Sequence, residues 1–237
     1  MDLVELKEHI NQLIKSLESN DKRYLEGRLK ELVSVFPFNE YEYILIYLRD
    51  KKLLTFQDYE LLRKRYVNTN QYLGLYEISP RVFGQVWGEQ HLMEVGDKFK
   101  KPDKRLDPKY SGEYDLWFDG IKLEIKACRA INTKKRGALV SKALCYSSQE
   151  PFWMNFQQLK PDAAHVFIFI GVWVDQIIYW VMSYREVNEC DYLSHQHRGG
   201  IEYQIGITNK NVADFDIYRV SRNNLIATII KKSKPKH

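Results

Sequence analysis

Hydrophobic residues recur at helical spacing through the first third of the chain. Leucine and isoleucine occupy positions 3, 6, 10, 13 and 17, leucine or valine occupies positions 25, 29, 32 and 33, and residues 41–48 and 58–66 continue the pattern. Apolar residues three and four positions apart share one face of an α-helix, so the spacing predicts four helices. Thr55 is the expected N-cap of the last one. We expect an N-terminal helical region over residues 1–75, for which DNA reading, dimerisation and plain packing all fit, and a second domain over residues 76–237.

A second pattern, with a period of two, covers residues 113–128 (EYDLWFDGIKLEIKAC). Asp119 and Gly120 are the pair that a two-residue hairpin turn prefers, because both tolerate positive φ angles. With the turn placed there, the expected cross-strand pairs are Phe118–Ile121, Trp117–Lys122, Leu116–Leu123 and Asp115–Glu124. Alternation then directs the large apolar side chains to one face, toward the core, and a row of polar and charged side chains to the other.

The polar face of this hairpin carries candidate chemistry. Asp115 would lie opposite Glu124, with Lys126 diagonal to Asp115. Two carboxylates about 5 Å apart repel by roughly 3 kcal/mol at an effective dielectric constant near 20. A divalent cation between them would reverse the sign of this interaction, and Mg²⁺ is usually held by one or two carboxylates plus a substrate phosphate. The alternative is an amphipathic surface hairpin whose charges are simply solvated.

Asp115 followed by Glu124-Ile125-Lys126 resembles the motif of the PD-(D/E)xK nuclease superfamily, to which most type II restriction endonucleases belong. Tyr114 stands where the family often has proline. The resemblance implies an α/β fold: a restriction-endonuclease-like mixed sheet core, of order αβββαβ, flanked by helices. It also implies Mg²⁺-dependent, sequence-specific cleavage of double-stranded DNA by a homodimer, with Asp115 and Glu124 as metal ligands and Lys126 serving the attacking water. A repair or recombination nuclease with the same core, and a non-catalytic DNA-binding regulator, are the alternatives.

A helix is expected before the hairpin, as in relatives of this superfamily. Ser79-Pro80 is a favourable helix start and Gly96 a plausible stop. Between them one stripe at helical spacing holds Val82, Val86, Glu89 and Met93. A carboxylate on an apolar stripe is costly to bury without a partner, so Glu89 is predicted to point inward as a further catalytic acid and metal ligand. The alternative is a glutamate at the edge of the stripe that reaches water.

The segments after the hairpin predict DNA contacts and the rest of the core. Residues 132–137 form a basic, turn-like segment in which Lys134, Lys135 and Arg136 could touch the phosphate backbone. A second helix is expected over 149–159, followed by strands over 165–174 and 177–184. A glycine pair at positions 199 and 200 requires a turn. The residues before it offer the side chains that read guanine and adenine edges, and the candidates are Gln196, His197 and Arg198.

Composition limits the class of protein. The 237 residues are 44% hydrophobic, as in an ordinary globular chain, and the net charge of +5 permits nucleic-acid binding without demonstrating it. Three irregularly spaced cysteines fit neither a disulfide framework nor a zinc finger and suggest a reducing cytoplasm. The resemblance to restriction endonucleases implies that this cytoplasm is prokaryotic. The apolar run 166–182 is split by Asp175-Gln176, and no secretory signal is visible, so no membrane association is expected.

Overall fold

The computed structural model describes residues 3–31, 38–195 and 202–234. Contacts divide the chain into two compact units. The helical unit consists of Met1–Glu77, Lys135–Gln149 and Trp173–Gln176. The sheet unit consists of Ile78–Lys134, Glu150–Val172 and Ile177–His237. Two short excursions from the second part of the sequence therefore belong to the helical unit.

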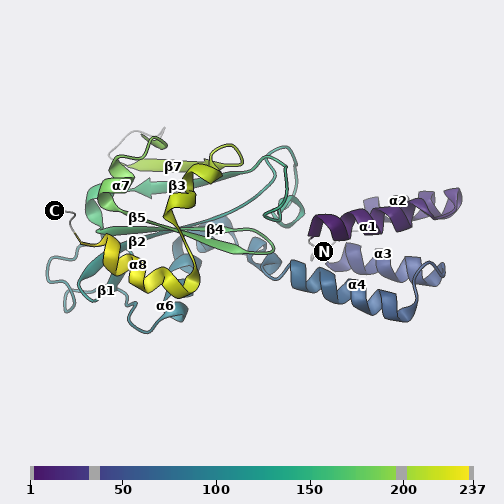
Figure 1. Ribbon diagram of the computed structural model, residues 1–237, viewed down its shortest axis with the longest axis horizontal. Helices are drawn as coiled ribbons and strands as arrows, with labels where there is room; N and C mark the ends of the chain where they lie inside the picture. The colour runs from purple at the N-terminus through teal and green to yellow at the C-terminus, as the bar shows by residue number, and fades with distance from the viewer. Residues whose placement is uncertain (1–2, 32–37, 196–201, 235–237) are drawn as a thin grey trace. The chain divides into compact units, whose positions relative to one another are not determined.

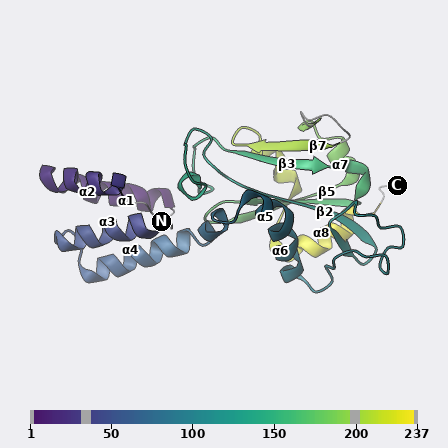
Figure 2. The same ribbon diagram turned by 180° about the vertical axis from the view of Figure 1, so that it is seen from behind.

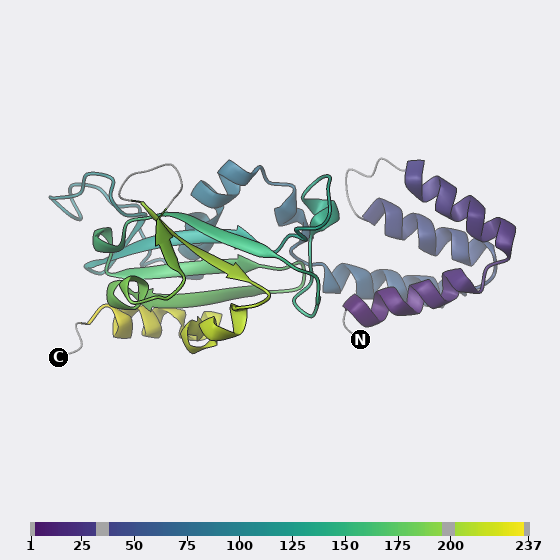
Figure 3. The ribbon, with the colours of Figure 1, turned by 90° about the horizontal axis from the view of Figure 1, so that it is seen from above.

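The described part of the helical unit contains four α-helices, as the apolar spacing predicted (Figure 3). They are α1 (Leu3–Lys15), α2 (Ser19–Glu31), α3 (Phe38–Asp50) and α4 (Phe56–Thr69), followed by the short helix η1 (Leu73–Tyr76). The predicted N-cap of α4 is confirmed: the Thr55 hydroxyl accepts a hydrogen bond from the Asp58 backbone N–H at 3.1 Å, and Asp58 completes a capping box. Tyr41 of α3 stacks on Tyr66 of α4, with ring centroids 3.7 Å apart.

The sheet unit contains a mixed five-stranded sheet of order β1-β2-β4-β5-β8. Its strands are β1 (Leu116–Phe118), β2 (Ile121–Arg129), β4 (Val166–Val172), β5 (Ile177–Ser183) and β8 (Arg219–Val220). Strands β2 and β4 are parallel, and the other neighbours are antiparallel. Every residue of β4 is buried, which explains its continuous apolar sequence. The predicted pair of strands joined by a turn at Asp175-Gln176 is confirmed, and the fold is mixed α/β.

A smaller antiparallel sheet of order β3-β7-β6 accompanies the main sheet. Its strands are β3 (Trp153–Leu159), β7 (Tyr203–Thr208) and β6 (Leu193–His195). The two faces of the main sheet are covered differently: α6 (Gly88–Val95) and α8 (Leu225–Lys232) lie on one side and the small sheet on the other (Figure 1). Short helices complete the unit, namely α7 (Tyr184–Asn188), η4 (Pro161–Ala163), η5 (Val212–Tyr218) and η6 (Arg222–Asn224), while η3 (Val140–Lys142) belongs to the helical unit.

The contacts on each face of β2 explain this layering. A Cβ atom on Gly88 would lie 3.2 Å from the Ala127 Cβ and 3.3 Å from Ile125 Cγ2, so α6 packs closely on the apolar face. On the opposite face, the ring of Phe156 from β3 lies 5.1 Å from that of Phe169 on β4. The polar face of the hairpin is therefore on the side of the small sheet.

The helix expected before the hairpin is present, but one of its turns is a π-helix. It begins at Pro80 after Ser79, as predicted, and runs through α5 (Pro80–Val82), η2 (Phe83–Trp87) and α6 before Gly96 (Figure 2). The predicted inward stripe was wrong at Val82 and Val86, which are exposed. A π-turn bonds i to i+5 and therefore rotates the helix face that follows it. Among the positions of this helix whose burial is described, Phe83, Gly88, Glu89 and Leu92 are buried.

The helix predicted over 149–159 was wrong, because most of that segment is strand β3. Phe152, Met154 and Phe156 are buried and alternate with an exposed Trp153 and a half-buried Asn155, which is the period of a strand. The connection from β2 to β4 thus carries a strand of the small sheet in place of a helix, and the expected order αβββαβ fails at this point. No helix in the described ranges is long and apolar enough to cross a membrane.

Candidate active site

The β1–β2 hairpin has the predicted register over the residues nearest its turn. Leu116–Leu123, Trp117–Lys122 and Phe118–Ile121 are cross-strand partners, as expected. Asp119 and Gly120 both have positive φ, at 46° and 89°, which is the conformation that a two-residue hairpin loop requires. The sequence of the turn therefore sets which side chains share a face.

Asp115 lies just beyond the paired residues, at the entrance to β1. Its backbone N–H donates to the Leu123 carbonyl at 2.9 Å, and its Oδ2 accepts a hydrogen bond from the Ile125 N–H at 2.8 Å. The second bond turns the carboxylate toward β2. The expected pair of Asp115 with Glu124 is therefore replaced by a side-chain contact to the backbone one residue further on.

Lys126 brings the two acids of the motif together. Its Nζ lies 2.5 Å from Glu124 Oε1 and 3.8 Å from Asp115 Oδ2. The exposed fractions of these side chains are 18% for Lys126, 6% for Glu124 and 25% for Asp115. The cluster is thus largely withdrawn from water, with Asp115 as its most accessible member.

Burial dominates the electrostatics of Glu124. It raises the pKa of the Glu124 carboxyl to about 7, the negative charge of Asp115 adds to the rise, and Lys126 opposes it. Burial alone would lower the pKa of the Lys126 ammonium, but the facing Glu124 and Asp115 carboxylates outweigh burial and raise it. A second cation held against these acids would stabilise the ionised form of Glu124.

The small sheet supplies two further charges that the sequence did not single out. Lys160, directly after β3, lowers the pKa of Glu124, and Glu202, directly before β7, raises that of Lys126. Both effects are minor beside those of burial and of the Lys126 contacts. No local motif marks either residue, because their approach to β2 depends on the packing of one sheet on the other.

Glu89 points inward, as predicted, with 9% of its surface exposed. Its carboxylate pairs with the ammonium of Lys101, a residue that sequence reasoning did not select. Lys101 follows Lys100, whose backbone exchanges two hydrogen bonds with Trp117 of β1. A buried carboxylate needs a partner, so the position of Glu89 on an apolar stripe indicated that a cation should lie nearby. It did not indicate which residue supplies that cation.

The donor set suits a two-carboxylate magnesium site. In the described part of the chain, no three histidine, cysteine, aspartate or glutamate side chains are grouped so that they could hold a metal ion together. Mg²⁺ is nevertheless commonly bound through one or two carboxylates, with water and substrate phosphate as its other ligands. Asp115 and Glu124 match that inventory, because both already contact one cationic group, the Lys126 ammonium.

The basic residues predicted to contact DNA do not all belong to the unit that carries the acids. Lys134, Lys135 and Arg136 are all exposed. Lys134 belongs to the sheet unit, where its N–H donates to Asn132 Oδ1 at 2.8 Å, whereas the other two belong to the helical unit. The remaining predicted contacts, Gln196, His197 and Arg198, lie outside the described residues.

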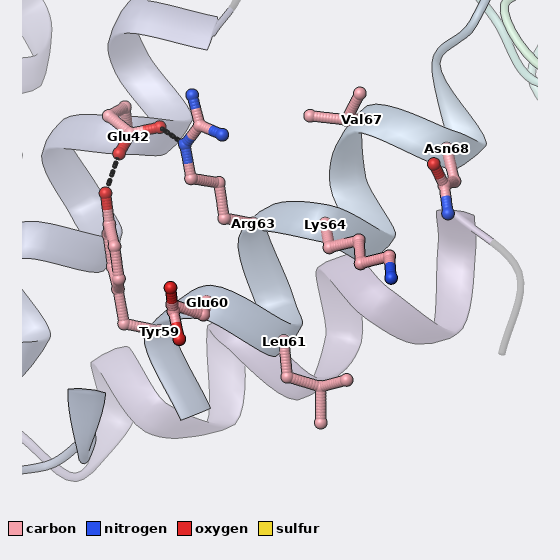
Figure 4. A pocket seen from close by; sticks show the side chains of 8 residues that line it. All are labelled: Glu42, Tyr59, Glu60, Leu61, Arg63, Lys64, Val67 and Asn68. Atoms are coloured by element: carbon pink, nitrogen blue, oxygen red, sulfur yellow. Dashed lines mark hydrogen bonds and ion pairs between the residues drawn. The ribbon is translucent and has the colours of Figure 1, made fainter. Parts of the chain in front are cut away.

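A shallow hollow of about 860 Å³ on the helical unit holds none of the predicted site residues. It is lined mainly by α4, and Figure 4 shows Tyr59 and Arg63 directed at the carboxylate of Glu42. Arg63 Nε donates to Glu42 Oε2 at 2.8 Å, and the Tyr59 hydroxyl donates to Oε1. The polar groups of Glu42, Tyr59 and Arg63 therefore satisfy one another.

Comparison with known proteins gives no family for this chain. Neither a scan against protein-family models nor a search of the curated proteins gives a match to this chain.

Proposed function

We propose that this protein is a Mg²⁺-dependent endonuclease that hydrolyses phosphodiester bonds in DNA. The observation that carries the proposal is the meeting of Asp115, Glu124 and Lys126 on one face of a hairpin, with the turn and register that the motif requires. A buried carboxylate with a raised pKa beside a second carboxylate has the character of a functional site. Two neighbouring carboxylates of this kind reduce the stability of the fold, but they can hold a cation between them.

Each residue has a distinct role in this proposal. Asp115 and Glu124 hold the metal, and Lys126 donates a hydrogen bond that orients the attacking water and balances the negative charge that develops on the phosphate. Bound magnesium would supply Lewis acidity toward the phosphate and lower the pKa of a bound water. The water oxygen forms a bond to phosphorus as the bond to the leaving oxygen breaks. The water releases a proton to solvent and the leaving oxygen takes one up, so that one water is added across the bond.

The substrate and assembly follow the same proposal. We propose double-stranded DNA as the substrate and sequence-specific cleavage by a homodimer, in the manner of a type II restriction enzyme, because a two-fold protein suits a two-fold site. The net charge of +5 is compatible with binding to a polyanion.

A plasmid-cleavage assay tests the proposed function. The full chain is incubated with supercoiled plasmid in Mg²⁺ or in EDTA, alongside Asp115→Asn and Lys98→Ala. Lys98 is a suitable control because it forms an exposed ion pair with Asp119 on the same hairpin. Discrete fragments from the wild type and Lys98→Ala, and none from Asp115→Asn or in EDTA, are expected.

Other outcomes of the assay would change the proposal. Cleavage restricted to branched DNA would indicate a structure-specific nuclease with the same site. Intact plasmid together with a gel shift would contradict catalysis and indicate a DNA-binding regulator.

A further inference from the structure

Lys101 is a cation at the edge of the candidate site without a role in the motif. Its neighbour Lys100 forms an isolated bridge with Trp117, so the chain before β1 lies beside that strand. The Lys101 ammonium contacts the Glu89 carboxylate. Burial lowers the pKa of Lys101, and the negative charge of Asp115 opposes that shift. Lys101 therefore lies against the acid on α6 and within the field of the acid at the start of β1.

The exposures of this ion pair are unequal. The Lys101 side chain is 60% exposed, whereas that of Glu89 is 11% exposed. An exposed lysine ordinarily samples many rotamers, and binding an anion then costs the entropy of fixing it. A buried carboxylate that holds the ammonium reduces this cost. The Lys101 ammonium can keep its ion-pair contact with Glu89, which is not a hydrogen bond, while its N–H donors reach a ligand.

The Glu89 carboxylate contacts a lysine ammonium, as the acids of the hairpin do. The two lysines differ in exposure, because the Lys126 side chain is 18% exposed and that of Lys101 is 60% exposed. Lys101 can therefore offer its charge to a ligand from solvent. This arrangement suits a negatively charged ligand beside Asp115 better than a second metal-binding carboxylate.

We propose that Lys101 contacts the phosphate backbone of the substrate and that Glu89 is its positioning residue. The inference rests on the proposed function, because it places a DNA phosphate next to the carboxylates of the hairpin. Lys101 and Lys126 then approach the phosphate from different segments, one from the loop before β1 and one from β2. Glu89 acts through Lys101 and does not touch the metal.

DNA binding in EDTA tests the role of Lys101 without any contribution from catalysis. Fluorescence anisotropy with a labelled duplex is measured over a salt series for the wild type, Lys101→Met, Lys101→Arg and Lys98→Met. Lys98 is a matched control because its side chain is also 60% exposed and pairs with an acid. We expect Lys101→Met to weaken binding about three- to tenfold and to reduce the salt slope by about 0.9, as for one lost phosphate contact. Lys101→Arg should restore most of the affinity, and Lys98→Met should match the wild type.

Glu89→Gln tests the positioning role. Removing a negative charge would, by electrostatics alone, strengthen DNA binding, whereas loss of positioning weakens it. We expect a two- to threefold weakening that disappears in the Lys101→Met background, because the two residues act as a unit. Glu89→Asp, which keeps the charge on a shorter side chain, provides a second variant if the glutamine variant is unstable. Stronger DNA binding by Glu89→Gln, or additive effects in the double variant, would overturn the positioning role.

Mn²⁺ binding without DNA, followed by electron paramagnetic resonance, separates this inference from the proposed function. We expect Glu89→Gln to bind Mn²⁺ within twofold of the wild type, whereas a tenfold or greater loss would make Glu89 a metal ligand and refute its assignment. If the wild type binds both DNA and Mn²⁺ but Lys101→Met behaves like Lys98→Met, only the role of Lys101 is refuted. If the wild type binds neither, the proposed function fails and this inference fails with it.

Discussion

Strand β2 carries two lysines on one face, four residues apart, and each lies between two carboxylates. Lys122 Nζ is 2.9 Å from Asp107 Oδ2 and 3.5 Å from Glu113 Oε1. Lys126 forms the second cluster, with the acids of the motif. The two clusters share residue types, strand and face, so the difference between them lies in how the acids are otherwise satisfied.

The acids around Lys122 have additional donors. Asp107 accepts hydrogen bonds from the Lys109 N–H at 3.1 Å and the Tyr114 hydroxyl at 3.2 Å, and Glu113 accepts one from the Ser111 N–H at 2.7 Å. The hydrogen bond from Lys122 is the main cause that lowers the pKa of Asp107, and the Ser111 N–H is the main cause for Glu113. This cluster stabilises the ionised acids and ties the loop before β1 to the hairpin.

Glu124 differs because Lys126 is its hydrogen-bond donor and, within the described residues, no backbone N–H joins it. Burial therefore raises its pKa, whereas the pKa values of Asp107 and Glu113 fall. A lysine between two acids thus has a structural role where each carboxylate also accepts a hydrogen bond from a backbone N–H. It is a candidate catalytic group where one of the carboxylates is buried and accepts too few hydrogen bonds.

The largest expected effect separates the two lysines by activity. Lys126→Met should reduce Mg²⁺-dependent plasmid cleavage by at least about 100-fold, because it removes a donor to the charge that develops on the phosphate. Lys122→Met should keep cleavage within about threefold of the wild type, since its partners lie outside the site. Initial cleavage rates at equal enzyme concentration measure both. Equal losses of cleavage activity in the two variants would contradict a functional difference between the Lys122 and Lys126 clusters.

The pH dependence of cation binding provides a second test of the difference between the Lys126 and Lys122 clusters. A metal ligand must be deprotonated, and the pKa of Glu124 is about 7, so protons compete with the metal below that value. We expect Mn²⁺ affinity to fall by roughly tenfold from pH 6.5 to pH 5.5 and to level off above pH 8. Titration by electron paramagnetic resonance checks this, with Asp107→Asn as the control that should leave the profile unchanged. A flat profile over this range would contradict the raised pKa.

The smallest expected effects concern stability, and they have opposite signs. The folded pKa of Asp107 is lowered, so its ion pair stabilises the fold at neutral pH, and this stabilisation is lost as pH falls through that folded pKa. The folded pKa of Glu124 is raised from 4.5 to about 7, so the folded state keeps a proton that the unfolded state loses, and stability falls as pH rises from about 4.5 to about 7. At pH 8 in EDTA, Asp107→Asn should lower the thermal midpoint by a few degrees, and Glu124→Gln should remove the fall in midpoint that ionisation of Glu124 causes between pH 5 and pH 8. Calorimetry at pH 8 and pH 5 measures both, and an unchanged pH dependence in Glu124→Gln would contradict this reasoning.

The hairpin could be predicted from sequence because its determinants are local. Asp119-Gly120 selects the turn, and the period-two pattern on both flanks then fixes which side chains share a face. Asp115 and Glu124 consequently both contact Lys126, although Asp115 accepts a hydrogen bond from the Ile125 N–H in place of the expected pairing with Glu124. Helical spacing was equally informative for α1 to α4, where an apolar stripe and the Thr55 cap sufficed.

The remaining features depend on contacts that local patterns do not contain. Segment 149–159 was assigned to a helix, but its alternate residues are buried between two sheets, and tertiary packing decided its conformation. The π-turn η2 changed which residues of the helix face inward, although Glu89 remained buried. Lys101 reaches Glu89 only because the loop before β1 bridges to Trp117, and no spacing in the sequence encodes that contact.

Anomalous diffraction from crystals soaked in Mn²⁺ tests the central claim most directly. The proposed site predicts a peak about 2.1–2.2 Å from one oxygen of Asp115 and one oxygen of Glu124, with the Lys126 ammonium displaced from its position between them. The same soak of Glu124→Gln crystals should lose the peak, and Asp107→Asn crystals should keep it. A wild-type structure saturated with Mn²⁺ that shows no peak at these carboxylates, or shows it at Asp107 and Glu113, would contradict the assignment.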